Sequence, residues 1–188
     1  MLIVAALVNF GVNGIQYAIQ LHLVSCGTNA TSIGFISGGI SLMMLVGSLL
    51  AGKLSDKVPV GPTVCLAYLF ICLCVLPMTL TDSYWIMLVA NSFVGLPFPL
   101  INAMLLGFIF AKSPTSMQGR ITVTLTVPAQ VLSMFCSAVA GTLLPVFGFH
   151  GAVLVFLAVL VASAVLVICS RSIRSIPKAA QWEHTMLR

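Results

Sequence analysis

The chain has 188 residues, of which 60% are hydrophobic and only 6% are charged, and its formal net charge is +5. Such a small share of polar side chains could not cover a core of this size in water, so the composition excludes a water-soluble domain and predicts an integral membrane protein. The positive charge does not indicate nucleic-acid binding, because the basic residues are scattered over short links and a tail instead of forming a patch.

Six apolar stretches are each long enough to cross a lipid bilayer as a helix, which takes about 20 residues. Helices are expected because backbone groups in lipid must form hydrogen bonds within their own segment. The predicted spans are residues 2–25, 31–52, 63–80, 84–111, 119–146 and 151–170. They predict an all-α membrane protein with a six-helix transmembrane domain over residues 1–170 and a polar cytoplasmic tail over residues 171–188.

The links between these spans differ in charge. The links after the first, third and fifth spans contain no Lys or Arg, whereas all the basic residues follow the second, fourth and sixth spans. Because positive charge is retained in the cytoplasm, this pattern predicts a multi-pass protein of the plasma membrane with both termini cytoplasmic. In the link after the second span, the sequence PVGP at residues 59–62 predicts an interruption of any helix. The basic residues are Lys53, Lys57, Lys112, Arg120, Arg171, Arg174, Lys178 and Arg188.

Amide and hydroxyl side chains recur at helical spacing inside the first, fourth and fifth spans. In the first span four amides are separated by four, three and four residues, which places them on one face of the helix. Amides are costly in lipid, so these faces either bond neighbouring helices or line a water-accessible cavity, and for the first span we favour the cavity. The predicted substrate-cavity residues are Asn9, Asn13, Gln16, Gln20, Asn91, Asn102, Thr126 and Gln130.

Titratable and metal-binding groups are scarce inside the spans. His22 lies near the outer end of the first span and is either a proton or substrate contact or an ordinary interfacial histidine. No span has an Asp or Glu in its interior, and the cysteines are not spaced to converge on a metal, so we expect no metal and no other cofactor. Without a catalytic constellation or a nucleotide-binding loop, the sequence does not predict an enzyme.

Prolines interrupt two of the spans. Residues 95–99 of the fourth span read GLPFP, and Pro128 lies beside the polar face of the fifth. Proline lacks a backbone donor and its ring clashes with the preceding turn, so we expect a kink, either static or acting as a hinge. The predicted hinge residues are Gly95, Pro97, Pro99 and Pro128. Small residues spaced by four, at Gly34 and Gly38 and at Ser137 and Gly141, predict close helix packing.

The link over residues 52–61 reads GKLSDKVPVG, which resembles the loop motif G-x-x-x-D-[RK]-x-G-[RK]-[RK] of the major facilitator superfamily. Gly52, Asp56 and Lys57 match it, while the later glycine is displaced and the final basic pair is missing, a form more usual in the second half of these transporters. Residues 114–120, PTSMQGR, resemble a P-x-x-x-x-G-R junction in the second half of efflux-type members.

The resemblance implies one six-helix half, the C-terminal one, of a transporter that exports a small organic solute by alternating access. The other half must come from another chain, a second copy or sequence not present here. The resemblance also implies that the first, fourth and fifth spans surround the substrate. The alternative is a membrane subunit or inactive fragment that transports nothing. The predicted conformational latch is Gly52, Asp56, Lys57 and Arg120, and the alternative for its lysines is that they only anchor the topology.

Overall fold

Helices account for all the secondary structure that the computed structural model describes, over residues 2–55, 57–111 and 113–170. The predicted all-α class is therefore confirmed. Asp56, Lys112 and the predicted tail lie outside the described residues. The elements are α1 (Leu2–Ser25), α2 (Ala30–Leu54), α3 (Val60–Val75), the 3-10 helix η1 (Leu76–Thr79), α4 (Tyr84–Gly95), α5 (Phe98–Ala111), the 3-10 helix η2 (Thr115–Met117) and α6 (Gln118–Cys169).

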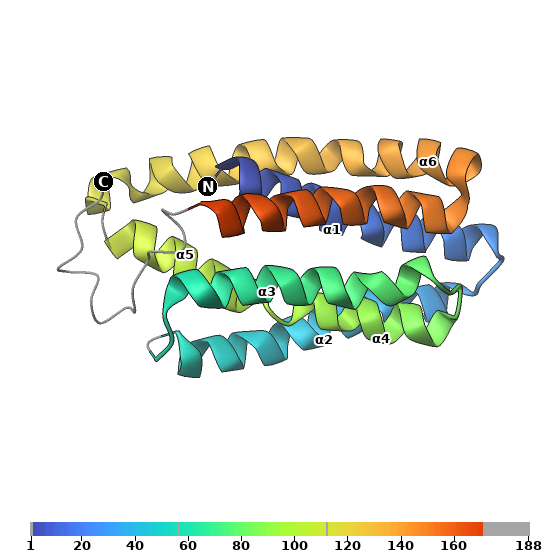
Figure 1. The fold of residues 1–188 in the computed structure, drawn as a ribbon, viewed down its shortest axis with the longest axis horizontal. Coiled ribbons are helices and arrows are strands. Elements are labelled where there is room, and N and C mark those ends of the chain that lie inside the picture. Colours follow the sequence, from blue (N-terminus) through green and yellow to red (C-terminus); the bar gives the residue numbers. More distant parts are fainter. Residues whose placement is uncertain (1, 56, 112, 171–188) are drawn as a thin grey trace.

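Five helical stretches in the described residues are long and apolar enough to cross a membrane. The last of these is α6, with 52 residues and one break in its helical backbone angles, at Gly148. Figure 1 shows α6 turning back at this point, so that its two arms run side by side. The predicted fifth and sixth spans are thus one element, and their expected link of several residues is reduced to a break at a single glycine.

The third predicted span begins earlier than expected. Pro59 has extended backbone angles and precedes α3, and Pro62 lies in the first turn of the helix. The backbone N–H groups of a first turn have no acceptor within the helix, so a proline there removes no hydrogen bond. The expectation that residues 59–62 interrupt any helix is therefore wrong for residues 60–62.

The helices form two groups (Figure 1). Helix α1 packs mainly against α6, whereas α2 packs against α4 and α5. Close approach in each group depends on glycine: a Cβ at Gly14 would overlap the Phe156 ring, and one at Gly47 would overlap the carbonyl oxygen of Leu96. By contrast, a Cβ at Gly34 or Gly38 would meet no atom within 4 Å, so this predicted packing face has no neighbour in the described chain.

Candidate functional site

A pocket of about 530 Å³ lies between α1, α3, α5 and α6. Its polar lining comes from different helices that only the fold brings together. Five of the predicted cavity residues are among those that line it: Asn9, Asn13, Asn102, Thr126 and Gln130. The rest of the lining is largely apolar and includes Leu105, Leu106, Ile109 and Met134. Among the described residues of the lining there is no Asp, Glu, Lys or Arg.

The amides of α1 in this pocket are held by their own helix. Asn9 Nδ2 donates to the carbonyl oxygen of Ala5 at 2.8 Å, and Asn13 Nδ2 donates to that of Asn9 at 2.8 Å. Asn13 Nδ2 also lies 3.2 Å from Ser133 Oγ, which connects α1 to α6. Within the described residues, no donor bonds to either carboxamide oxygen. These oxygens can therefore accept hydrogen bonds from water or from a solute.

Two tyrosines also line the pocket and were not predicted. Tyr17 follows Asn13 by four residues, so the spacing that identified the amides of α1 places it on the same face. Tyr68 belongs to α3, where no polar stripe exists in the sequence, and only the packing of α3 beside α6 brings it to the pocket. The sequence thus carried a signal for Tyr17 and none for Tyr68.

Three predicted cavity residues, Gln16, Gln20 and Asn91, are not in the described lining of this pocket. Gln16 Nε2 donates to Asn91 Oδ1 at 3.1 Å and so connects α1 to α4. Asn91 is only 1% exposed, and its Nδ2 has no partner within the described residues. Gln16 shares the helix face of Asn9 but lies two turns further along α1, where its side chain reaches Asn91 of α4. For this pair, the alternative of bonding between neighbouring helices matches the observed contact.

The fourth predicted span is divided at the predicted position. Helix α4 ends at Gly95 and α5 begins at Phe98, with Pro99 in its first turn. A Cβ at Gly95 would lie 2.7 Å from the carbonyl oxygen of Ile40, so this glycine also permits the close packing of α2. The chain behaves differently at Pro128, where α6 remains helical.

The described residues of the predicted latch, Gly52, Lys57 and Arg120, lie at one end of the bundle. Gly52 is in the last turn of α2, and Lys57 is exposed in the link that follows. Arg120 is exposed in the first turn of α6, at the same end of the molecule (Figure 1). The described residues show no ion pair for Lys57 or Arg120. The predicted partner Asp56 lies outside the described residues.

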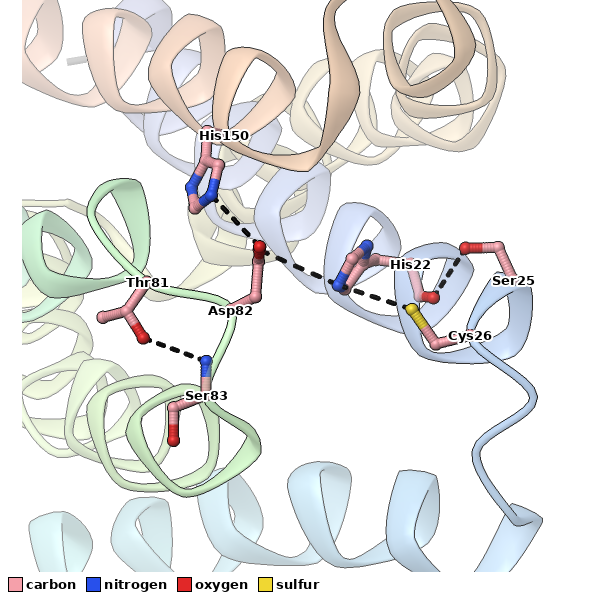
Figure 2. A network of polar contacts seen from close by, with 7 residues as sticks. All are labelled: His22, Ser25, Cys26, Thr81, Asp82, Ser83 and His150. Atoms are coloured by element: carbon pink, nitrogen blue, oxygen red, sulfur yellow. Dashed lines mark hydrogen bonds and ion pairs between the residues drawn. The ribbon is translucent and has the colours of Figure 1, made fainter.

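At the opposite end, His22 belongs to a cluster that was not predicted (Figure 2). Its Nε2 lies 3.9 Å from Asp82 Oδ1, and His150 Nε2 lies 3.3 Å from Asp82 Oδ2. These residues come from the three links without Lys or Arg, or from helix ends beside them, so the charge pattern places them on one side without indicating contact. No group of three or more His, Cys, Asp and Glu in the described residues is arranged to hold a metal ion.

The family model described as Major Facilitator Superfamily matches residues 1–186, which is nearly the whole chain. No curated protein matches it.

Proposed function

The chain belongs to the major facilitator superfamily, a family of membrane transporters, and on this premise we propose that it carries a small organic solute across the membrane by alternating access. The observation that supports this proposal is the pocket between α1, α3, α5 and α6. Polar side chains from all four helices line it inside an otherwise apolar bundle, which is how a solute path differs from a packed membrane core.

The lining of the pocket suggests the class of solute. Its polar groups are neutral amides and hydroxyls, and its walls are aliphatic side chains and methionine. An ion with a high charge would lose its hydration without gaining a counter-charge, which is unfavourable in a low-dielectric site. A neutral or weakly polar, moderately hydrophobic compound fits better, and we propose that the direction is efflux.

The proposed transporter needs a second six-helix half. The side chains of Asn102, Thr126 and Gln130 in the pocket are exposed, and so is a run of large apolar residues on the first arm of α6. The open faces at Gly34 and Gly38 of α2 and at Gly141 of α6 would allow close approach of further helices. We assign this chain to the C-terminal half, with each arm of α6 crossing the membrane; the other half is a separate chain, a second copy or sequence not present here.

Gly52, Asp56, Lys57 and Arg120 are proposed to form the latch at the basic end, which alternately closes and releases. Gly95, Pro97 and Pro99 are proposed as the hinge between α4 and α5, since the helix is already interrupted there. Pro128 would contribute a bend within α6, because a proline ring clashes with the backbone carbonyl of the preceding helical turn. With these roles, the proposal covers the conformational change of the transporter as well as the binding of the solute.

The test is solute flux in liposomes that contain the purified chain together with its second half. Thr126 and Thr124 form a matched pair, because both are exposed on α6 and both donate to the carbonyl oxygen four residues earlier, at 2.9 and 2.8 Å. Only Thr126 is in the described lining of the pocket. We expect Thr126→Val to lower the flux of a neutral hydrophobic dye by about fivefold, the effect of losing one hydrogen bond, and Thr124→Val to leave it unchanged.

Asn13→Leu is a second variant for the same assay, with an expected loss of about tenfold because both a ligand contact and the bond to Ser133 disappear. Equal flux in Asn13→Leu, Thr126→Val and the parent protein would show that the solute does not pass this pocket. A complete absence of flux in the parent protein, whichever second half is supplied, would favour the alternative of a membrane subunit that transports nothing.

A further inference from the structure

Three segments that are distant in the sequence meet at the end of the bundle opposite to the basic residues (Figure 2). His22 lies in the last turn of α1, Asp82 in the link before α4, and His150 just after the reversal of α6. Asp82 lies between the two histidines, with one carboxylate oxygen 3.9 Å from His22 Nε2 and the other 3.3 Å from His150 Nε2. A single carboxylate thus connects segments that would have to separate if this end of the bundle opened.

We propose that these residues form a proton-binding lock, in which His22 takes up the proton, Asp82 supplies the opposite charge and His150 positions the carboxylate. When the proton is bound, the ion pair between His22 and Asp82 holds α1 against the link before α4. When the proton leaves, only the contact between His150 and Asp82 remains, and the α1 side of the lock is free to separate.

The surroundings of the two histidines distinguish their roles. His150 Nδ1 is buried and has no hydrogen-bond partner among the described residues. A proton on this nitrogen would be a buried donor without an acceptor, which is unfavourable. His150 therefore presents Nε2, and not Nδ1, to Asp82 Oδ2, at 3.3 Å. It is a positioning residue: it acts on the carboxylate and does not bind the transferred proton.

The ring of His22 contacts an aromatic ring as well as the carboxylate. Its ring stacks on that of Phe149, with a centroid distance of 4.4 Å and an interplanar angle of 25°. The face of a phenyl ring carries partial negative charge and attracts a cation that lies above it. The carboxylate of Asp82 adds Coulombic attraction from the other side. The side chain of His22 is 19% exposed, so protons from the adjacent water can reach it.

Few other ionisable groups face this cluster. The thiol of Cys26 lies 3.8 Å from His22 Nε2 and is the one further titratable group in contact with it among the described residues. Tyr84, at the start of α4, donates its hydroxyl to the carbonyl oxygen of Ser32 on α2. Lys53 and Lys57 belong to the last turn of α2 and the link after it, and Arg120 to the first turn of α6, and these parts lie at the other end of the molecule (Figure 1). Within the described chain, only a protonated histidine can therefore neutralise Asp82.

The sign of the pH dependence follows from this arrangement. Histidine is the side chain that ordinarily changes charge between about pH 5 and pH 8. The His22–Asp82 attraction is present at the acidic side of this range and is lost as the pH rises through it. Because Asp82 is 57% exposed, water screens the pair, and the expected change in the closed population is several-fold and not a complete switch. If the proposed transport function holds, the lock would link proton binding to the opening of this end.

The test is hydrogen–deuterium exchange of the full chain in lipid nanodiscs without any solute, at roughly pH 5.5 and pH 8, corrected for the intrinsic pH dependence of exchange. We expect amides of the link over residues 80–84 to be about fivefold better protected at the acidic pH. His22→Gln and Asp82→Asn should each abolish this difference. His184→Gln, which removes the remaining histidine of the sequence, should preserve it and is the matched control.

His150→Gln tests the division of roles through the midpoint of the pH profile. Without its positioning bond the carboxylate moves more freely, so His22 binds its proton less tightly and the midpoint shifts to lower pH. A shift to higher pH would mean that His150 itself was a competing cation, and would overturn the assignment. A difference in protection that survives His22→Gln, or that disappears in His184→Gln, would overturn the lock. Because no solute is present, a failure of the transport proposal would not alter these results.

Discussion

Chemically similar residues on one face of α1 have different roles in the structure. Asn9 and Asn13 lie in the pocket and bond to their own helix through their amide nitrogens, so their oxygens remain available. Gln16 instead uses its amide to satisfy Asn91, a residue of α4 that is almost fully buried. A polar side chain in a membrane bundle can thus mark either a passage or a helix contact, and its partner decides which.

The Gln16–Asn91 pair leads to a prediction about stability. In Gln16→Leu, Asn91 Oδ1 loses its donor, so that both polar atoms of this buried side chain lack a partner within the described residues. We therefore expect the free energy of unfolding to fall by about 1 kcal/mol. The measurement is reversible unfolding of the chain in mixed micelles. Gln20→Leu is the matched control, because it changes the same residue type on the same helix at a position that has no hydrogen bond within the described residues.

The double variant Gln16→Leu with Asn91→Leu should recover most of the lost stability, because it removes the orphaned polar group together with its partner. A double variant that is less stable than Gln16→Leu alone would contradict this account of the pair. The result would then indicate that Asn91 stabilises the bundle through a contact other than Gln16.

At the scale of elements, breaks in helices shape this bundle as much as the helices themselves. The interruption between α4 and α5 coincides with prolines, as local chemistry predicts. The reversal of α6 does not occur at its prolines: the chain remains helical through Pro128 and Pro145 and breaks at Gly148. Gly148 has φ 69° and ψ −178°, a combination that is essentially restricted to glycine.

The break in α6 predicts the effect of a single methyl group. Gly148→Ala should lower the free energy of unfolding by about 1–3 kcal/mol, because a Cβ strains the backbone in this conformation even though no atom lies within 4 Å of it. Gly141→Ala is the control in the same helix: its surroundings are also open, but its φ is not positive. In thermal unfolding of the two variants in the same detergent, Gly148→Ala should be the less stable one. Equal stability of the two variants would contradict the strain argument.

At the scale of the whole molecule, the two ends of the bundle differ in chemistry. Within the described chain, the end with Lys53, Lys57 and Arg120 is basic, whereas the other end has the cluster around Asp82 (Figures 1 and 2). The family match establishes a transporter of the major facilitator type. The difference between the two ends predicts an orientation with the basic end in the cytoplasm, where basic links are retained.

The chain contains its own probes of orientation. Cys26 lies in the link after α1 and Cys169 in the last turn of α6, at opposite ends, and both are exposed. If the basic end is cytoplasmic, a membrane-impermeant maleimide should label Cys26 in intact cells and Cys169 only after permeabilisation. Variants that retain just one of these cysteines allow the two to be read separately. The reverse labelling pattern would contradict the predicted orientation of both termini.

Much of the architecture follows from local properties of the chain. A run of about 20 apolar residues identifies a helix in lipid whatever surrounds it, and a spacing of three or four residues determines which side chains share a face. The membrane class, the approximate helices, the break near Pro97 and the two asparagines of α1 that line the pocket could therefore be predicted. The start of α3 at Val60 and the break in α6 at Gly148 could not be predicted. The residue types at these positions permit the observed backbone angles but do not require them.

The sequence by itself determined that the chain is helical, that it lies in a membrane and that its links differ in charge from one side to the other, since these depend on composition and on spacing along one helix. Only the tertiary structure decided which helix lies against each polar group. It paired Gln16 with Asn91, brought Tyr68 to the pocket and placed Asp82 between two histidines. The physical reason is that periodicity gives the direction of a side chain around its own axis, whereas its partner depends on the packing of residues far away in the sequence.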